Sequence, residues 1–216
     1  MNQVRERTDG ALLFDAYREQ ENNPQRYAKN DDLNGLEHVL YICPHCGGEF
    51  TIAVRNNHTL YCTACGYAQR SDEYGFLHND GHGPEIRYIS DWSRHIFDNL
   101  KAKIRQDPGM SLSADRSFRM LSPDKPKFVD VGSGSITLSS AGFRIEGTIR
   151  SEEVDLIVPV GNIPTLPFSP GKYLEIQHGS DIYRCVLNDG KLVMKFINMV
   201  KIFYELRTKE LAEATP

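Results

Sequence analysis

The clearest periodic pattern in the chain is an apolar stripe in the stretch 90–107. Its members recur every four residues, with one neighbour widening the same face: Trp92, Ile96, Phe97, Leu100 and Ile104. This spacing places apolar side chains on one face of an α-helix. Ser90 is suited to cap the start of the helix, and Pro108-Gly109 to end it. The pattern predicts an amphipathic helix over 90–107 that packs against a core.

Alternation of apolar and polar residues dominates the second half, from about residue 112 to 187. The runs 132–134 and 139–142, rich in glycine and serine, are interpreted as turns between strands. Beyond residue 190, apolar residues return at helical spacing: Leu192, Phe196, Val200, Phe203 and Leu206. We expect an antiparallel sheet of about seven short strands, covered by one C-terminal amphipathic helix.

The first half holds a compact stretch around two cysteine pairs. Residues 36–42 and 50–54 are expected to be strands, and the Arg-Asn-Asn-His run at 55–58 a turn. Residues 1–35 are strongly polar and are interpreted as a lead-in or linker. The sequence therefore predicts an α+β chain in four parts: the lead-in 1–35, a small rubredoxin-like or zinc-ribbon β unit over 36–77, a connecting segment 78–110 containing the helix 90–107, and an antiparallel β domain with a C-terminal helix over 111–210.

The cysteine spacing carries the strongest chemical signal. Cys43 and Cys46 are separated by two residues, and after an interval Cys62 and Cys65 repeat this spacing, which is typical of a four-cysteine zinc site. A glycine follows each pair, and glycine lets the backbone turn its N–H groups toward sulfur. Two facing pairs make a closed tetrahedral site with no position for water, so zinc at Cys43, Cys46, Cys62 and Cys65 would be structural.

Alternatives to structural zinc remain at this point. Rubredoxin-type iron uses related spacing and stays open. A thioredoxin-type site would need one reactive pair in a βαβ context, which the pattern does not indicate. His45 and His58 are surplus to four thiolates and are expected at the surface or behind the ligands. A segment of about 40 residues buries too little apolar area to fold alone, so we expect the metal to supply folding energy.

Composition narrows the possible partners. The net charge is −4 and the pI is near 6.0, and the segment 36–77 contains Arg55 and Arg70 without a basic cluster, so nucleic acid is not expected as a partner.

No apolar run approaches the roughly 20 residues that a membrane span needs. The first seven residues do not resemble a secretory signal, and Cys185 stands apart from the two pairs. We expect a reducing, cytoplasmic compartment.

The sequence contains no phosphate-binding loop, no G-x-S-x-G elbow and no H-E-x-x-H pair. His78 and His82 lie among glycines and are interpreted as part of an exposed turn. The Gly-Ser run at 132–135 is interpreted as a strand connection, and Cys185 as a buried structural thiol. No catalytic residue is therefore predicted.

Four runs of the sequence resemble a known family: GLEHVLYICPHC at 35–46, LYCTACG at 60–66, EYGFL at 73–77 and ISDW at 89–92. They are similar to the region after the catalytic domain in bacterial 1-acyl-sn-glycerol-3-phosphate acyltransferase-like proteins, over most of residues 10–207. The family's His-x4-Asp motif is missing, since none of the seven histidines has an aspartate five positions later. The last 90 or so residues also resemble a PH-like or GRAM-like module in strand count and C-terminal helix.

The resemblance implies a non-catalytic accessory region of a lysophospholipid acyltransferase-like protein. Its expected partner is the parent acyltransferase domain or another protein, with at most weak contact to a membrane at the inner face. Candidate headgroup contacts are Lys125, Lys127, Arg144, Arg150, Lys172 and Arg184, but nearby acids dilute their field: Glu146, Glu152, Glu153, Asp155 and Glu175. The alternatives are a stand-alone zinc-ribbon interaction module unrelated to lipids, and a small enzyme of unknown type.

Overall fold

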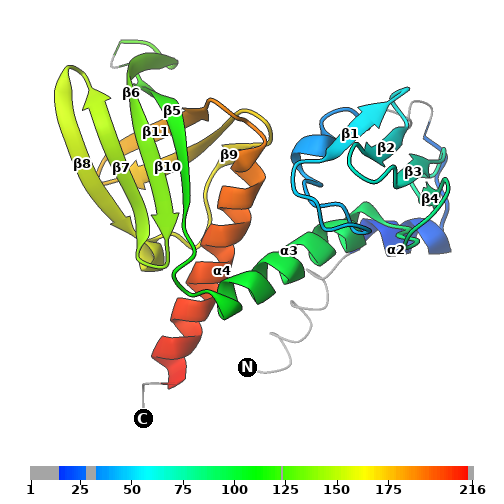
Figure 1. The fold of residues 1–216 in the computed structure, drawn as a ribbon. Helices are drawn as coiled ribbons and strands as arrows, with labels where there is room; N and C mark the ends of the chain where they lie inside the picture. Colours follow the sequence, from blue (N-terminus) through cyan, green and yellow to red (C-terminus); the bar gives the residue numbers. More distant parts are fainter. Residues whose placement is uncertain (1–14, 28–32, 123, 214–216) are drawn as a thin grey trace. The chain divides into compact units, whose positions relative to one another are not determined.

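The computed structural model describes residues 15–27, 33–122 and 124–213, and it divides the chain into two compact units (Figure 1). The ribbon unit comprises Met1–Asn34 and Ile42–Arg94, and the β unit comprises Gly35–Tyr41 and His95–Pro216. Each unit has its own antiparallel sheet, of four and seven strands. The predicted α+β class, with two sheets and a C-terminal helix, is confirmed.

The sheet of the ribbon unit has the order β1-β2-β3-β4. Its strands are β1 (Ile52–Arg55), β2 (Thr59–Cys62), β3 (Ala68–Ser71) and β4 (Leu77–Asn79). The turn between β1 and β2 contains Asn56 and Asn57, with left-handed φ of 52° and 62°. Asparagine tolerates this conformation better than most residues, so the predicted turn is confirmed for the reason given.

Two expectations for the N-terminal part are wrong. Residues 36–42 do not form a strand, because Leu36–His38 is the short 3-10 helix η1 and Ile42 makes only an isolated bridge to Glu49. Part of the expected lead-in is also folded: Ala16–Asn22 forms the helix α2, and Gln20 is buried, donating to the carbonyl of Tyr74. The apolar run at 36–42 indicated burial correctly but not the backbone conformation. The expectation for residues 1–14 lies outside the described residues.

The helix α3 spans Ile89–Gln106, within one residue of the prediction at each end. Its apolar stripe is confirmed as core, because Trp92, Ile96, Leu100 and Ile104 are each at most 1% exposed. The helix is shared between the units: its first residues, up to Arg94, belong to the ribbon unit and the remainder to the β unit.

The sheet of the β unit has the order β8-β7-β6-β5-β11-β10-β9, which leaves β8 and β9 as its two edges. Its strands are β5 (Leu112–Leu121), β6 (Phe128–Ser139), β7 (Gly142–Ile149), β8 (Glu152–Pro159), β9 (Phe168–Ser169), β10 (Tyr173–His178) and β11 (Asp181–Leu187), with the 3-10 helix η2 (Val160–Asn162) after β8. The expected seven strands are confirmed.

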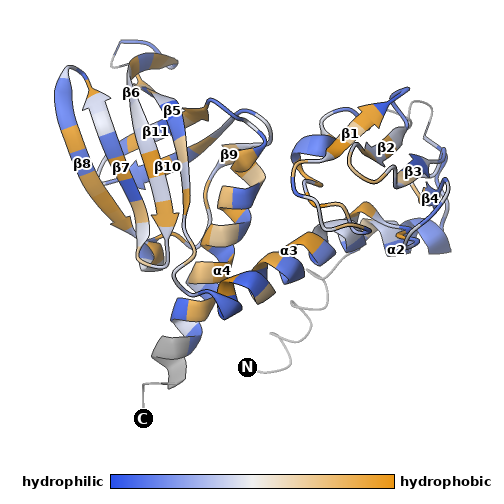
Figure 2. Cartoon of the chain, in the orientation of Figure 1, coloured by the Kyte–Doolittle hydropathy of each residue, from blue (hydrophilic) through white to orange (hydrophobic). Residues whose placement is uncertain are grey.

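The C-terminal helix α4 (Leu192–Glu213) covers the core of this sheet. Phe196 of α4 stacks on Phe143 of β7, with ring centroids 5.8 Å apart. Hydrophobic and hydrophilic residues alternate along the strands (Figure 2), so one face of the sheet builds the core and the other is polar.

The run at 132–135 is not the strand connection that the sequence predicts, because it lies inside β6. Gly134 pairs with Gly147 of β7, and a Cβ atom on Gly134 would lie 2.0 Å from the carbonyl oxygen of Glu146. Here glycine allows two strands to approach closely, which is its other common use within a sheet. Among the described residues, no helix has both the length and the hydropathy needed to cross a bilayer.

Candidate metal centre

Each cysteine pair lies on a tight turn, and the two turns have the same hydrogen bonds. In the first, the Gly47 N–H donates to the carbonyl of Cys43, and the Cys43 N–H donates to the carbonyl of Gly48, both over 2.9 Å. In the second, the Gly66 N–H donates to the carbonyl of Cys62 over 3.0 Å, and Cys62 donates to Tyr67 over 2.7 Å. The glycines have left-handed φ of 72° and 77°, a conformation that other residues adopt only with strain. The sequence pattern of a pair followed by glycine is therefore explained by the backbone.

The two turns face each other and bring the four predicted ligands together. All four Sγ atoms lie within 4.8 Å of one another, with Cys43 and Cys65 at 3.7 Å and Cys46 and Cys62 at 3.8 Å. A tetrahedral ion with metal–sulfur bonds of about 2.3 Å holds its sulfur atoms about 3.8 Å apart. The cluster fits a four-coordinate metal ion.

The thiols of the cluster have unequal acidity. Desolvation holds the pKa of the Cys43 thiol well above its usual range. Burial also acts to raise the pKa of Cys62, but contacts with the Thr51 hydroxyl, 3.2 Å away, and with the backbone N–H groups of Cys65 and Ala64 outweigh it and lower that pKa to about 6. Four thiolates this close repel one another strongly, so a bound cation is needed to hold all of them charged.

Three side chains contact backbone carbonyl groups around the cysteine cluster. Trp92 Nε1 donates to the carbonyl of Ile42, next to the first ligand, over 2.9 Å. The Tyr67 hydroxyl donates to the carbonyl of Pro84 over 2.8 Å, and burial raises the pKa of Tyr67 to about 12. His82 Nε2 lies 3.1 Å from the carbonyl oxygen of Cys65. These contacts join segments up to 50 positions apart in the sequence, and only the tryptophan had a sequence signal, its place on the apolar stripe.

The remaining histidines add no ligand to the cluster. His45 is exposed, with its ring 5.0 Å from that of His82, and His58 is half-buried beside the β1–β2 turn. His78 lies in β4 rather than in an exposed turn, with Nε2 2.7 Å from Asp72 Oδ2. Within the described ranges, the four cysteines are the one group of three or more side chains positioned to share a metal ion.

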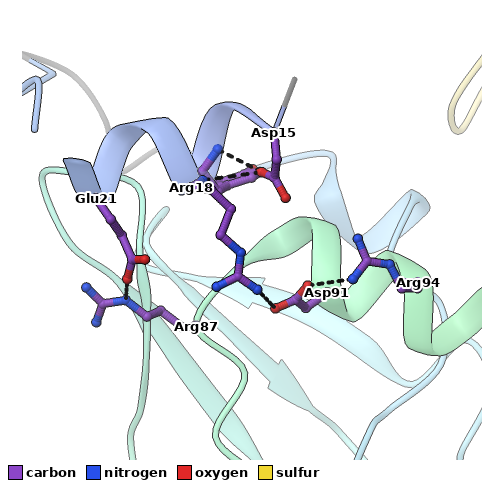
Figure 3. A network of polar contacts seen from close by, with 7 residues as sticks. Asp15, Arg18, Glu21, Arg87, Asp91 and Arg94 are labelled. Carbon is purple, nitrogen blue, oxygen red and sulfur yellow. Dashed lines mark hydrogen bonds and ion pairs between the residues drawn. The ribbon is translucent and has the colours of Figure 1, made fainter. Parts of the chain in front are cut away.

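Several polar contacts join the helix α2 to the rest of the ribbon unit (Figure 3). Asp15 caps its first turn by accepting from the N–H of Tyr17. Arg18 lies 3.5 Å from Asp91 at the start of α3, and Glu21 accepts from Arg87 over 2.9 Å. The helix α2, which lies within the expected lead-in, is thus part of the unit that carries the cysteine cluster.

Two of the candidate headgroup residues of the β unit are paired with acidic side chains. Arg144 is paired with Asp155 over 2.8 Å, and Arg184 with Glu175 over 2.7 Å. The other four are exposed: Lys125, Lys127, Arg150 and Lys172. Pairing neutralises two of the six predicted cations, which reduces the attraction to an anionic surface.

Cys185 is fully buried, as predicted. Burial raises the pKa of its thiol to about 12, in spite of the nearby guanidinium of Arg116. A thiol with such a pKa stays protonated at neutral pH and is a poor nucleophile.

Comparisons with protein families, with curated proteins and with solved structures find no match to this chain. A functional assignment therefore depends on the cysteine cluster and on the surfaces of the two units.

Proposed function

We propose that the four cysteines hold a structural zinc ion, and that the chain is a non-catalytic accessory module that docks to a protein partner. The observation that carries the metal assignment is the sulfur tetrahedron, with edges of 3.7 Å and 3.8 Å between the two turns. Four thiolates complete the coordination of zinc and leave no position for water or substrate. Zinc in such a site stabilises the fold and performs no chemistry on a ligand.

The chain's own residues prepare the site for the ion. The two glycines direct backbone N–H groups back toward the turns, and the contacts around Cys62 favour its thiolate. Trp92 fixes the carbonyl directly before Cys43. When zinc binds, it keeps all four thiolates deprotonated and supplies folding energy to the ribbon unit.

Metal analysis of protein purified without chelators tests this assignment. We expect one equivalent of zinc per chain and no visible absorption. Less than half an equivalent of zinc, a disulfide within either pair, or the visible absorption of a rubredoxin-type ferric site would contradict it.

We propose a 1-acylglycerol-3-phosphate acyltransferase domain as the docking partner. Support comes from the sequence resemblance around the cysteine pairs and from the missing His-x4-Asp motif. Trp92 is fully buried and is therefore unsuited to contact a partner. The edge strand β8 remains a suitable surface, because one side of its backbone is unpaired and Ile157 on it is 59% exposed.

Binding of the purified chain to an isolated bacterial acyltransferase catalytic domain is the direct test, measured by biolayer interferometry. We expect saturable binding that Ile157→Asp on β8 weakens, whereas Leu121→Asp, at another exposed apolar residue, leaves it unchanged. The chain alone should form no product from lysophosphatidic acid and an acyl donor. Turnover by the chain alone would refute the accessory role. Absence of binding would favour the alternative, an interaction module unrelated to lipid metabolism.

A further inference from the structure

In the β unit, the end of α3 and the β6–β7 turn lie close to α4 (Figure 1). Residues from these three elements line a groove. Its volume is about 550 Å³, within the range of small-molecule sites in proteins. Every residue that lines it belongs to the β unit, and none is a cysteine ligand.

The floor of the groove is apolar. Ile104 of α3 and Phe203 of α4 line it, and they are 1% and 3% exposed, respectively. Leu206 follows Phe203 by three positions and therefore lies on the same face of α4. Lys101 of α3 forms an ion pair with Glu205 of α4, which fixes the two helices beside the groove.

The rim of the groove is cationic. Arg105 of α3 and Arg207 of α4 both line it and are both exposed. Among the side chains that the structure describes, no ion pair joins Arg105 or Arg207 to a carboxylate. Ser140, in the β6–β7 turn, adds a hydroxyl group to the same rim.

We infer that this groove binds a single-chain amphiphile with an anionic head, in which the apolar tail lies on Phe203 and Leu206 and the head is held between Arg105 and Arg207. Guanidinium groups bind carboxylate and phosphate through paired, charge-assisted hydrogen bonds, which the rim offers from two sides. The apolar floor favours a ligand with a hydrocarbon tail over a free anion. This inference goes beyond the proposed docking role and is independent of the metal site.

The test is an NMR titration of the full-length, zinc-loaded chain with decanoate below its micelle concentration. We expect saturable shifts of the amides of Ser140 and Ala141 and of residues 203–207. Arg105→Gln and Arg207→Gln should each weaken binding about tenfold, as expected for loss of one charge-assisted hydrogen bond. Arg150→Gln is the matched control, because it removes another exposed arginine, which does not line the groove, and should leave the affinity unchanged.

Ala141→Leu provides a second variant, because it adds bulk to the exposed wall of the groove and leaves the core intact. It should abolish the decanoate shifts without changing the thermal midpoint.

Three comparison ligands separate the sources of binding: acetate has the head alone, decyltrimethylammonium has the tail with the opposite charge, and phosphatidylglycerol vesicles present a bilayer. Equal affinity for acetate or for decyltrimethylammonium would overturn the inference. The inference would also be overturned if the arginine variants bind decanoate with the wild-type affinity, or if the amides of the groove shift with vesicles and not with decanoate.

Discussion

Replacing Trp92 by phenylalanine tests whether the first turn of the cysteine cluster depends on support from α3. Trp92 is fully buried, and its Nε1 donates to the carbonyl of Ile42 over 2.9 Å. Ile42 is also fully buried, so its oxygen has no access to water when the indole N–H is removed. Phenylalanine keeps most of the apolar contact, including the edge-to-face packing on Tyr67.

The magnitude follows from two losses. A buried carbonyl left without its donor costs about 1–3 kcal/mol. The cavity left by the smaller ring costs about 1 kcal/mol more. The ribbon unit should therefore lose about 2–4 kcal/mol of stability. If zinc leaves through local opening of this unit, the open state becomes roughly thirtyfold to several hundredfold more populated.

The assay is the rate of zinc transfer to an excess of a metallochromic chelator, together with the thermal midpoint of the ribbon unit. Ile96→Val serves as control, because Ile96 lies one turn further along the same helix, is equally buried and belongs to the β unit. It should cost about 1 kcal/mol without faster zinc loss. A Trp92→Phe variant that releases zinc at the wild-type rate would refute the supporting role.

Three further predictions concern the two units. Cys62→Ser should unfold the ribbon unit, which a red shift in the fluorescence emission of Trp92, the one tryptophan of the chain, would report. The NMR methyl signals of the β unit should persist, and their loss would contradict separate stabilisation of the two units. Burial raises the pKa of Tyr67 to about 12, whereas an unfolded tyrosine ionises near pH 10. The stability that the protonated Tyr67 hydroxyl contributes is complete below about pH 10 and is lost as the pH rises through about 12. Denaturant unfolding should therefore show a stability deficit of Tyr67→Phe at pH 8 that becomes smaller between about pH 10 and pH 12. Gly134→Ala should cost about 3 kcal/mol or more in chemical denaturation, because its Cβ would lie 2.0 Å from a backbone oxygen, while Gly161→Ala, with open space around it, should be nearly neutral.

Features governed by local chemistry could be read from the sequence. The four cysteines are separated by short spacings, and the turn that each pair requires is set by neighbouring glycines, so their convergence could be predicted. The stripe on α3 was likewise predictable, because burial of one helical face imposes a period on the sequence. The Asn56-Asn57 turn followed from side chains that tolerate left-handed backbone.

The wrong predictions arose where one local signal is compatible with two structures. Glycine marks a turn as readily as a close approach of two strands, and only the register of β6 against β7 decides for Gly134. The apolar run at 36–42 indicated burial, but a run this short has no clear period, and its first residues form η1 in the β unit.

The sequence by itself determined the four-cysteine cluster, the fold class and the helix α3, because each depends on residues close together in the chain. Tertiary structure alone decided that Trp92 supports the turn of Cys43, and that α2 is tied to the ribbon unit through Arg18 and Glu21. It also decided that Arg105 and Arg207 border one apolar groove. These contacts join residues tens of positions apart, and their partners are selected by packing geometry, which leaves no period or spacing in the sequence.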